Sequence, residues 1–230
     1  MQKMAELIKD IHSRNHLIHH RFHLRIEIDN LDAYEIAEEM IKNGKVHEIS
    51  FMDHTPGQGQ YRNLEIYRST IAKYQGRDQD EIQMEQLLQE QMEKKTLSAA
   101  QMQQLTKMAQ ERKIAVASHD DDTEEKMALN REIGVTISEF PVTLAAARKA
   151  KDMGFQTVVG APNIMLGGSH SGNLSAAEAI LDGCADILCS DYYPPAILHS
   201  IFHMHENYGV PLPEMVKKAT LNPAQESPQF

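Results

Sequence analysis

Short runs of β-forming residues alternate with longer helical segments along almost the whole chain, and this alternation most constrains the fold. We predict strands at residues 23–28, 47–54, 114–120, 135–140, 155–162 and 185–191. Helical segments follow them, most clearly at 30–44, 123–134, 143–154 and 175–183, and two more helices extend to about residue 220. Such a repeat predicts parallel strands joined by helical crossovers.

Two α/β architectures fit this order: a (β/α)8 TIM-type barrel and an open doubly wound sheet. No glycine-rich phosphate fingerprint follows the first strand, which weakens the dinucleotide-binding form of the open sheet. A barrel gathers its active site at the carboxyl ends of all its strands, whereas an open sheet binds ligands mainly at one switch point. The pattern favours a barrel, because ionisable residues follow most predicted strands: Glu27, Asp53, His54, His119 to Asp122, Glu139 and Asp191.

The chain of 230 residues is long enough to bury one sizeable core, and we predict a single domain over 1–230. Only about six βα units are present, so the barrel is expected to be incomplete. Residues 62–112, rich in Gln, Glu and Met, are predicted as a peripheral helical insertion with a break near Gly76. No apolar run is long enough to span a membrane, and the helical N-terminus lacks the apolar segment of a secretory signal.

The charge of the chain narrows its partners. A formal net charge of −10 argues against general nucleic-acid binding, which depends on basic patches. It leaves open a small phosphorylated substrate, since a metal ion can supply positive charge locally. The two cysteines, Cys184 and Cys189, are placed unfavourably for a mutual disulfide, and reduced cysteines without an export signal predict a cytoplasmic location.

Imidazole and carboxylate side chains at the ends of separate strands are what a divalent transition metal requires, with a coordination position left for water. The candidate ligands, each from a different predicted strand, are Glu27, His54, His119 and Asp191. Asp121 and Asp122 directly precede the helix at 123–134, and we expect them to cap it.

Six motifs occur in an order that resembles the PhnM-type amidohydrolases of bacterial phosphonate metabolism. They are HHRFHLRIEI (19–28), SFMDHTPGQGQY (50–61), ASHDDDT (117–123), ISEFPVT (137–143), GAPNIMLGGSHSGN (160–173) and SDYYPPAILHSIF (190–202). The resemblance covers the chain from about residue 15 to about 224, where NPA (222–224) follows a helix as in other amidohydrolase barrels. It implies a (β/α)8 metal-dependent hydrolase barrel.

The resemblance also implies an activity and a site. The family hydrolyses α-D-ribose 1-methylphosphonate 5-triphosphate to the 5-phosphate and pyrophosphate, using divalent ions such as zinc or another transition metal. By analogy, Glu27 is a bridging carboxylate, His54 and His119 are imidazole ligands, and Asp191 is both ligand and general base. For phosphate binding the candidates are Arg21 and Arg25, for each of which a structural ion pair is the alternative, and the loop residues Gly167, Gly168, Ser169, His170 and Ser171.

The chain also departs from the family pattern. The strand ending in His-x-His that opens amidohydrolase barrels, and the strand after it, would precede residue 1. The pair His203 and His205 lies in a predicted helix, where residues two apart point about 200° apart and cannot chelate one ion together. No sequence is present for the flanking β-sandwich, and Leu166 stands where the family usually has a basic residue.

These departures leave three readings open. The chain is a phosphonate-pathway hydrolase, an amidohydrolase acting on a cyclic or N-acyl amide, or a truncated, non-catalytic amidohydrolase-like domain. An incomplete barrel would expose sheet edges and core surface. We therefore expect a homo-oligomer, or completion by other segments.

Overall fold

A computed structural model describes residues 2–14, 17–18, 20–75, 81–169 and 172–226. Its centre is a six-stranded, wholly parallel sheet in the order β1-β2-β3-β4-β5-β6, so each strand lies beside its predecessor in the chain. The strands are β1 His23–Glu27, β2 Glu48–Met52, β3 Ala115–His119, β4 Ile137–Glu139, β5 Gln156–Gly160 and β6 Ile187–Cys189. An open doubly wound sheet reverses its strand order at a switch point, and this sheet does not. The predicted α/β class, an incomplete TIM-barrel-like fold, is confirmed.

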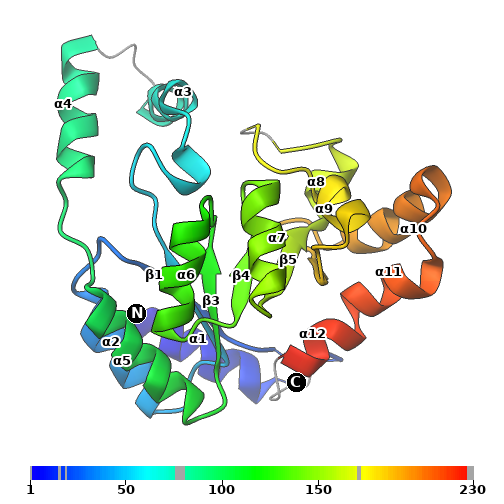
Figure 1. Cartoon of the computed structure of the whole chain (residues 1–230). Helices are drawn as coiled ribbons and strands as arrows, with labels where there is room; N and C mark the ends of the chain where they lie inside the picture. The colour runs from blue at the N-terminus through cyan, green and yellow to red at the C-terminus, as the bar shows by residue number, and fades with distance from the viewer. Residues whose placement is uncertain (1, 15–16, 19, 76–80, 170–171, 227–230) are drawn as a thin grey trace.

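Helices connect the strands and cover one face of the sheet (Figure 1). They are α1 Gln2–Ser13, α2 Ala33–Lys42, α3 Leu64–Gln75, α4 Glu81–Met92, α5 Ala99–Gln110, α6 Glu124–Ile133, α7 Leu144–Asp152, α8 Ala161–Met165, α9 Ala176–Asp182, α10 Ala196–Tyr208, α11 Leu212–Ala219 and α12 Leu221–Glu226, with a 3-10 turn, η1, at Gly59–Tyr61. Hydroxyl caps begin four of them. The capping residues, each of which accepts a hydrogen bond from the backbone N–H three residues on, are Ser98, Thr123, Thr143 and Ser175. Gly134 ends α6 in the left-handed conformation that glycine tolerates best.

Local signals misplaced two element boundaries and missed one helix. Helix α2 begins at Ala33 rather than at Asn30, because turns at residues 28–32 intervene. The predicted strand 155–162 ends at Gly160, and α8 starts immediately with Pro162 in its first turn. At this position the absence of an N–H group in proline costs no helical hydrogen bond. A third C-terminal helix, α12, follows the two that were predicted.

Alternating side chains give the sheet an apolar outer face and a polar inner face. The outer face packs under the helices in two cores, one beneath α2, α5 and α6 around Ile26, Ile49 and Val116, the other beneath α8 to α11 around Val159 and Leu188. The inner face has only a small apolar layer, comprising Ala115, Ala117, Ile137, Val158 and Ile187. The polar residues of this face, described below, therefore project into the interior of the partial barrel.

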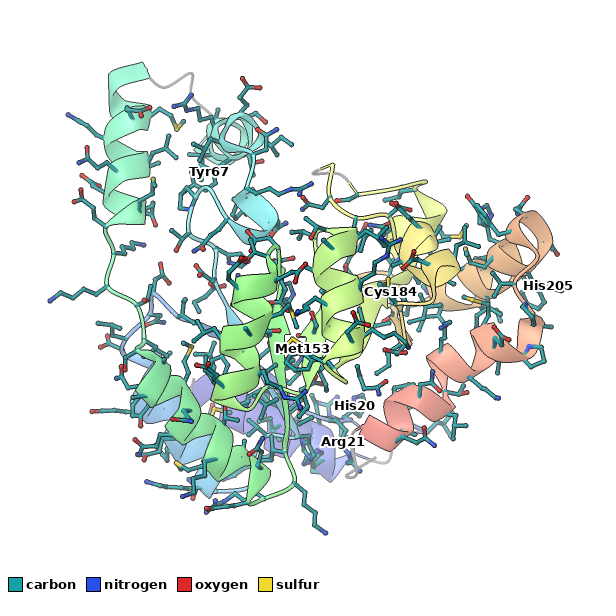
Figure 2. All side chains as sticks on the ribbon, in the orientation of Figure 1. His20, Arg21, Tyr67, Met153, Cys184 and His205 are labelled. Carbon is teal, nitrogen blue, oxygen red and sulfur yellow. The ribbon has the colours of Figure 1, made fainter. Side chains whose placement is uncertain are left out.

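The segment 62–112 divides into two parts. Helix α5 belongs to the helical layer, because it packs on α2, α6 and β3 with Leu105 fully buried. Helices α3 and α4 instead project from the body (Figure 1) and hold together through Tyr67, Met84 and Leu88. Figure 2 shows Tyr67 in this arm, well away from Met153 in the main body. The predicted break near Gly76 lies outside the described residues. Among the described helices, none has the length and apolarity needed to cross a membrane.

Candidate active site at the carboxyl ends of the strands

A chain of polar contacts links the ends of β1, β2 and β3. Glu27 Oε2 lies 3.0 Å from His54 Nδ1, and the other nitrogen of this ring lies 3.8 Å from Asp120 Oδ2. The same aspartate oxygen is 2.8 Å from His119 Nδ1. Arg25 completes the chain with its Nη2 atom 2.9 Å from His119 Nε2. Three predicted ligands, Glu27, His54 and His119, are thus brought to one rim, joined through Asp120.

Three residues that follow strand ends have an unusual backbone conformation. Asp120, Phe140 and Asp191 all have positive φ, at 55°, 54° and 49°, and each directly follows a strand or lies two residues beyond it. A non-glycine residue in this region carries strain that the surrounding structure must hold in place. Three of the four non-glycine residues with positive φ in the described part of the chain thus follow the carboxyl ends of β3, β4 and β6, while the fourth, Lys113, precedes β3.

Two neighbouring residues, Arg25 and Asp120, fix the tautomer of His119. The guanidinium of Arg25 can only donate, so His119 Nε2 must present its lone pair. The ring proton therefore sits on Nδ1 and is donated to the carboxylate of Asp120. A carboxylate that holds a histidine in this way is the usual second partner of a metal-binding imidazole. Asp120, at 6% exposure, is placed for such a role, which its position in the strand-end run 119–122 did not by itself indicate.

The hydrogen bonds of this network shift the pKa values of His54 and Asp120 in opposite directions. Hydrogen bonds to Asp120 and to Glu27 raise the pKa of His54 to about 9, against the opposing effect of burial. Burial alone would raise the pKa of Asp120, but the hydrogen bonds from His119 and His54 outweigh it and the pKa is lowered. Two carboxylates thus hold a proton on the imidazole between them, which marks this place as one that favours a cation.

Without bound metal, the free energy of unfolding is expected to fall as pH rises from about 6.5 to about 9. Because the folded-state pKa of His54 is raised, its stabilisation is complete below the unfolded value of 6.5 and is lost as pH rises through about 9. The raised pKa values of Glu48 and Glu139, about 7 and about 8, act in the same direction. Melting temperatures in chelator across this range should therefore decline less steeply for His54→Asn than for the wild type. Equal slopes would remove His54 from this account.

A cavity of about 310 Å³ opens beside the network. Arg25, His119 and Asp120 line one side of it, and Asp191 lines another. Its remaining walls include Phe140, Gly160, Asn163, Leu166, Gly168, Ser169, Asn173 and Tyr192. The fourth predicted ligand, Asp191, thus shares a cavity with His119, whereas Glu27 and His54 are not among the residues that line it.

The predicted phosphate loop reaches the cavity only in part. Gly168 and Ser169 line it, and Gly167 adjoins them with a φ of 75°. His170 and Ser171 lie outside the described residues. Arg21 precedes β1, near the amino end of the sheet, while Arg25 faces the cavity.

The expected capping role of Asp121 and Asp122 is wrong. Thr123 caps α6 instead. Asp121 is fully buried and accepts hydrogen bonds from Ser118, Ser138 and Asn130 at 2.6–2.7 Å. Asp122 accepts from the backbone N–H of Gly59 at 2.7 Å and so ties the loop after β2 to the loop after β3. The hydrogen bonds of both aspartates therefore stabilise the segments at the strand ends.

Comparisons with known proteins bear on the family and the fold of the chain. No protein-family profile matches the chain. The chain is 38% identical, over 230 residues and 98% of its length, to the curated alpha-D-ribose 1-methylphosphonate 5-triphosphate diphosphatase of Escherichia coli K12. The chain is a homologue of the PhnM-type amidohydrolases. The predicted resemblance is confirmed, and the chain spans 60% of the length of this relative.

Solved structures support the fold of this PhnM homologue. An ochratoxinase from A. niger aligns with a TM-score of 0.54 at 15% identity, covering 88% of this chain and 44% of that one. An uncharacterized protein aligns with a TM-score of 0.50 at 15% identity, covering 85% and 46% of the two chains. At such identity the likeness concerns the fold alone.

The donor set at the rim fits a divalent cation in chemistry. His119 presents a lone pair, and His54 holds a proton that a metal ion could replace. Among the described residues, however, the four predicted ligands do not form one group of converging ligand atoms. The group that does, His23, Glu48 and Glu139, lies deeper on the inner face. A period-two run of polar residues in β1, His23, Arg25 and Glu27, is the sequence signal that could have pointed to it.

The two histidines of the His-x-His pair belong to α10 and make separate local contacts. His203 Nδ1 lies 3.2 Å from Asn207 Nδ2, and His205 Nδ1 lies 2.9 Å from the carbonyl of Val210. Both are engaged near the end of their own helix, and neither lines the cavities beside the rim. Cys184 and Cys189 are free thiols, and only Cys189 is in β6, so the two do not share a strand.

Proposed function

We propose that this PhnM homologue forms a metal-dependent hydrolase site that cleaves α-D-ribose 1-methylphosphonate 5-triphosphate to the 5-phosphate and pyrophosphate. Support comes from the activity for which the E. coli relative is named, and from the residues at the rim. The observation that carries the proposal is the fixed tautomer of His119, held by Asp120 with its Nε2 lone pair directed at a cation position now taken by Arg25.

In this proposal Glu27, His54, His119 and Asp191 hold the divalent metal, which we take to be zinc or another transition ion on the basis of its imidazole and carboxylate ligands. When bound, the metal polarises a phosphoryl oxygen and lowers the pKa of a water molecule. Since Arg25 occupies the lone pair of His119, its guanidinium must leave that nitrogen when metal binds. It then becomes available to a phosphate or phosphonate oxygen of the substrate in the same cavity.

The remaining roles follow from position. Gly168 and Ser169 line the same cavity. The backbone N–H of Gly168 donates to the Asn163 carbonyl, so the Ser169 hydroxyl is the group proposed to meet phosphate oxygens. Asp191 is proposed to accept the proton of the attacking water. The absence of a side chain at Gly160 keeps this carboxylate accessible, because a Cβ there would lie 3.3 Å from the Phe140 ring and 3.8 Å from Asp191 Oδ2.

Asp191→Asn is expected to keep metal partly bound and to lower kcat by on the order of 10²-fold or more, since an amide cannot accept the proton. Steady-state pyrophosphate release, measured beside metal content, checks this. Asp152→Asn, at an exposed position of α7, is the matched control and should leave the rate unchanged. A rate within about twofold of the wild type would give Asp191 a structural role only.

The proposed reaction is tested by supplying ribose 5-triphosphates to the metal-loaded protein and measuring pyrophosphate. Dihydroorotate and an N-acetylated amide, tested in parallel, address an amide-hydrolysing alternative. Pyrophosphate release with no amide turnover supports the proposal. Amide turnover alone, or less than one tightly held divalent ion per chain with no turnover, contradicts it.

We also propose that the chain associates with copies of itself in the cytoplasm. In the part of the chain that the structure describes, β1 and β6 each pair with a single neighbour, so both edges of the sheet have unused backbone hydrogen-bonding groups. Light scattering after size exclusion should give a mass of at least about twice the 26.0 kDa of one chain. A 26.0 kDa species across the concentrations tested would exclude stable association.

A further inference from the structure

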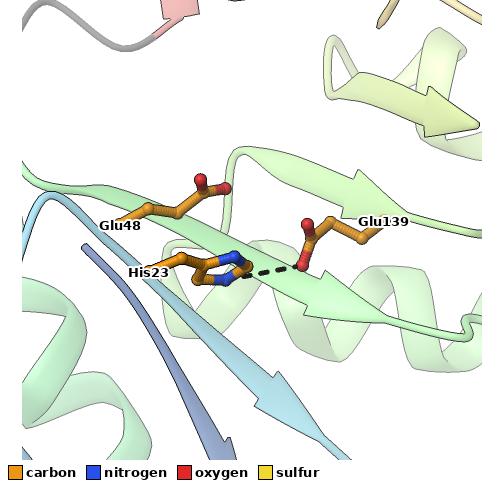
Figure 3. A group of neighbouring side chains, drawn as sticks. All are labelled: His23, Glu48 and Glu139. Carbon is orange, nitrogen blue, oxygen red and sulfur yellow. Dashed lines mark ion pairs between the residues drawn. The ribbon is translucent and has the colours of Figure 1, made fainter. Parts of the chain in front are cut away.

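A second group of potential metal ligands lies on the inner face of the sheet, with two members at the amino ends of their strands and Glu139 in register with His119 of the rim. His23 on β1, Glu48 on β2 and Glu139 on β4 point toward one another (Figure 3). One ligand atom from each lies within 4.8 Å of the other two. We call these three residues the inner cluster. They line a cavity of about 380 Å³ that also contains Arg25, His119 and Asp191, so the inner cluster adjoins the rim site but shares none of its proposed ligands.

One carboxylate of the inner cluster lacks the partners that its burial demands. Glu139 is 8% exposed, and its Oε2 atom has no hydrogen-bond partner among the described residues. His23 Nε2 lies 3.7 Å from this oxygen, beyond hydrogen-bonding distance (dashed line in Figure 3). Buried carboxylates are normally hydrogen-bonded, paired or bound to metal. This oxygen is directed at His23 and Glu48, where an ion would satisfy it.

The imidazole of the inner cluster is neutral and presents a lone pair. Burial, and then the positive charge of Arg25, lower the pKa of His23 to about 4. Ser50 Oγ lies 2.9 Å from His23 Nε2. Nε2 also faces Glu139, and a metal ion bound there would replace its contact with Ser50. The geometry thus directs an uncharged nitrogen donor into the cluster.

The charges of the cluster are incompletely balanced. Burial raises the pKa of Glu48 to about 7. Burial, and then the charge of Glu48, raise that of Glu139 to about 8. Arg25 is the cation that opposes this effect at Glu139, and it is engaged with His119 and with Met52 Sδ. A divalent ion would offset two carboxylate charges in one step.

We propose that His23, Glu48 and Glu139 bind a divalent transition-metal ion, separate from the one at the rim. One nitrogen and two carboxylate ligands suit zinc better than calcium or magnesium, which prefer oxygen ligands alone. Bonds of about 2.0–2.2 Å require the ligand atoms to approach one another by roughly 1 Å, within reach of rotamer adjustment in the glutamates. Three protein ligands leave a further coordination position open to the cavity.

The experiment is a Zn²⁺ titration of the chelator-treated chain, followed by calorimetry and by elemental analysis after dialysis. The wild type is expected to show two classes of site. Glu139→Gln should remove one class, lowering its affinity by on the order of 100-fold or more, since loss of even an outer-shell partner costs about 10–100-fold. Glu125→Gln, an exposed position on α6, is the matched control and should keep both classes.

A rim variant separates this inference from the proposed function. His54→Asn should lose the rim ion and keep the ion that depends on Glu139. His23→Asn provides a second test of the inner cluster, with circular dichroism confirming the fold of each variant. Glu139→Gln and Glu125→Gln with the same zinc content and affinity would overturn the inner site. So would a wild type with a single class of sites that His54→Asn abolishes, a result that leaves the proposed function intact.

Discussion

Replacing His119 with alanine is expected to abolish both the retention of divalent metal at the rim and the hydrolysis of the triphosphate substrate. The residue is 8% exposed at the end of β3, and both of its ring nitrogens are engaged, one with Asp120 and one with Arg25. Removing the imidazole deletes a ligand and leaves the guanidinium and the carboxylate to pair with each other. The cation position would then be closed by a permanent internal ion pair.

Two measurements check this expectation. Metal content of the purified variant should fall by one ion per chain, and pyrophosphate release should drop by at least about 10³-fold, which corresponds to about 4 kcal/mol of transition-state stabilisation. His199→Ala, on the exposed surface of α10, is the matched control and should retain both. Unchanged metal content in His119→Ala would remove this residue from the ligand set.

Replacing Asp121 with alanine is expected to have the largest effect on stability. Its carboxylate is fully buried and accepts from two serine hydroxyls and one amide, contributed by β3, β4 and α6. Alanine would leave all three donors without their acceptor. Since a buried donor without a partner costs about 1–3 kcal/mol, the free energy of unfolding should fall by about 3 kcal/mol or more.

Thermal and urea denaturation measure this loss, which corresponds to a drop in Tm of roughly 6–12 °C for a chain of this size. Asp121→Asn is the matched control. Its amide oxygen can still accept, and the serine hydroxyls can rotate to accept from its NH2 group, so it should cost about 1 kcal/mol. Equal losses in the two variants would show that volume, not hydrogen bonding, accounts for the contribution of Asp121.

Local signals were sufficient where a boundary is set by neighbouring residues. Helix α6 begins at its Thr123 cap and ends at Gly134 because both signals act within a few residues of the backbone that they satisfy. The same signals failed at α8. There the β-rich run continues to Pro162, but the strand has no neighbour to pair with beyond Gly160, where β6 ends its register at Cys189.

The three aspartates after β3 also show where local signals are not sufficient and tertiary contacts decide. Asp120, Asp121 and Asp122 look equivalent in sequence, and a helix follows them, so capping was the local expectation. A positive φ at Asp120 rotates the three side chains apart. Asp120 then meets His119 and His54, Asp121 turns into the core, and Asp122 meets the backbone of Gly59. Only contacts between segments far apart in the chain could assign these three roles.

By itself the sequence determined the α/β class, the six parallel strands, and the family resemblance, because periodicity and long motifs are properties of contiguous residues. It also brought Glu27, His54 and His119 forward as strand-end residues. Only the tertiary structure decided that Asp120 joins them, that Arg25 holds the lone pair of His119, and that His23, Glu48 and Glu139 converge beneath the rim. The reason is geometric. Which side chains share a face follows from strand register, and register is set by packing between strands that lie far apart in the chain, such as β2 and β3, where Glu48 pairs with Ala115.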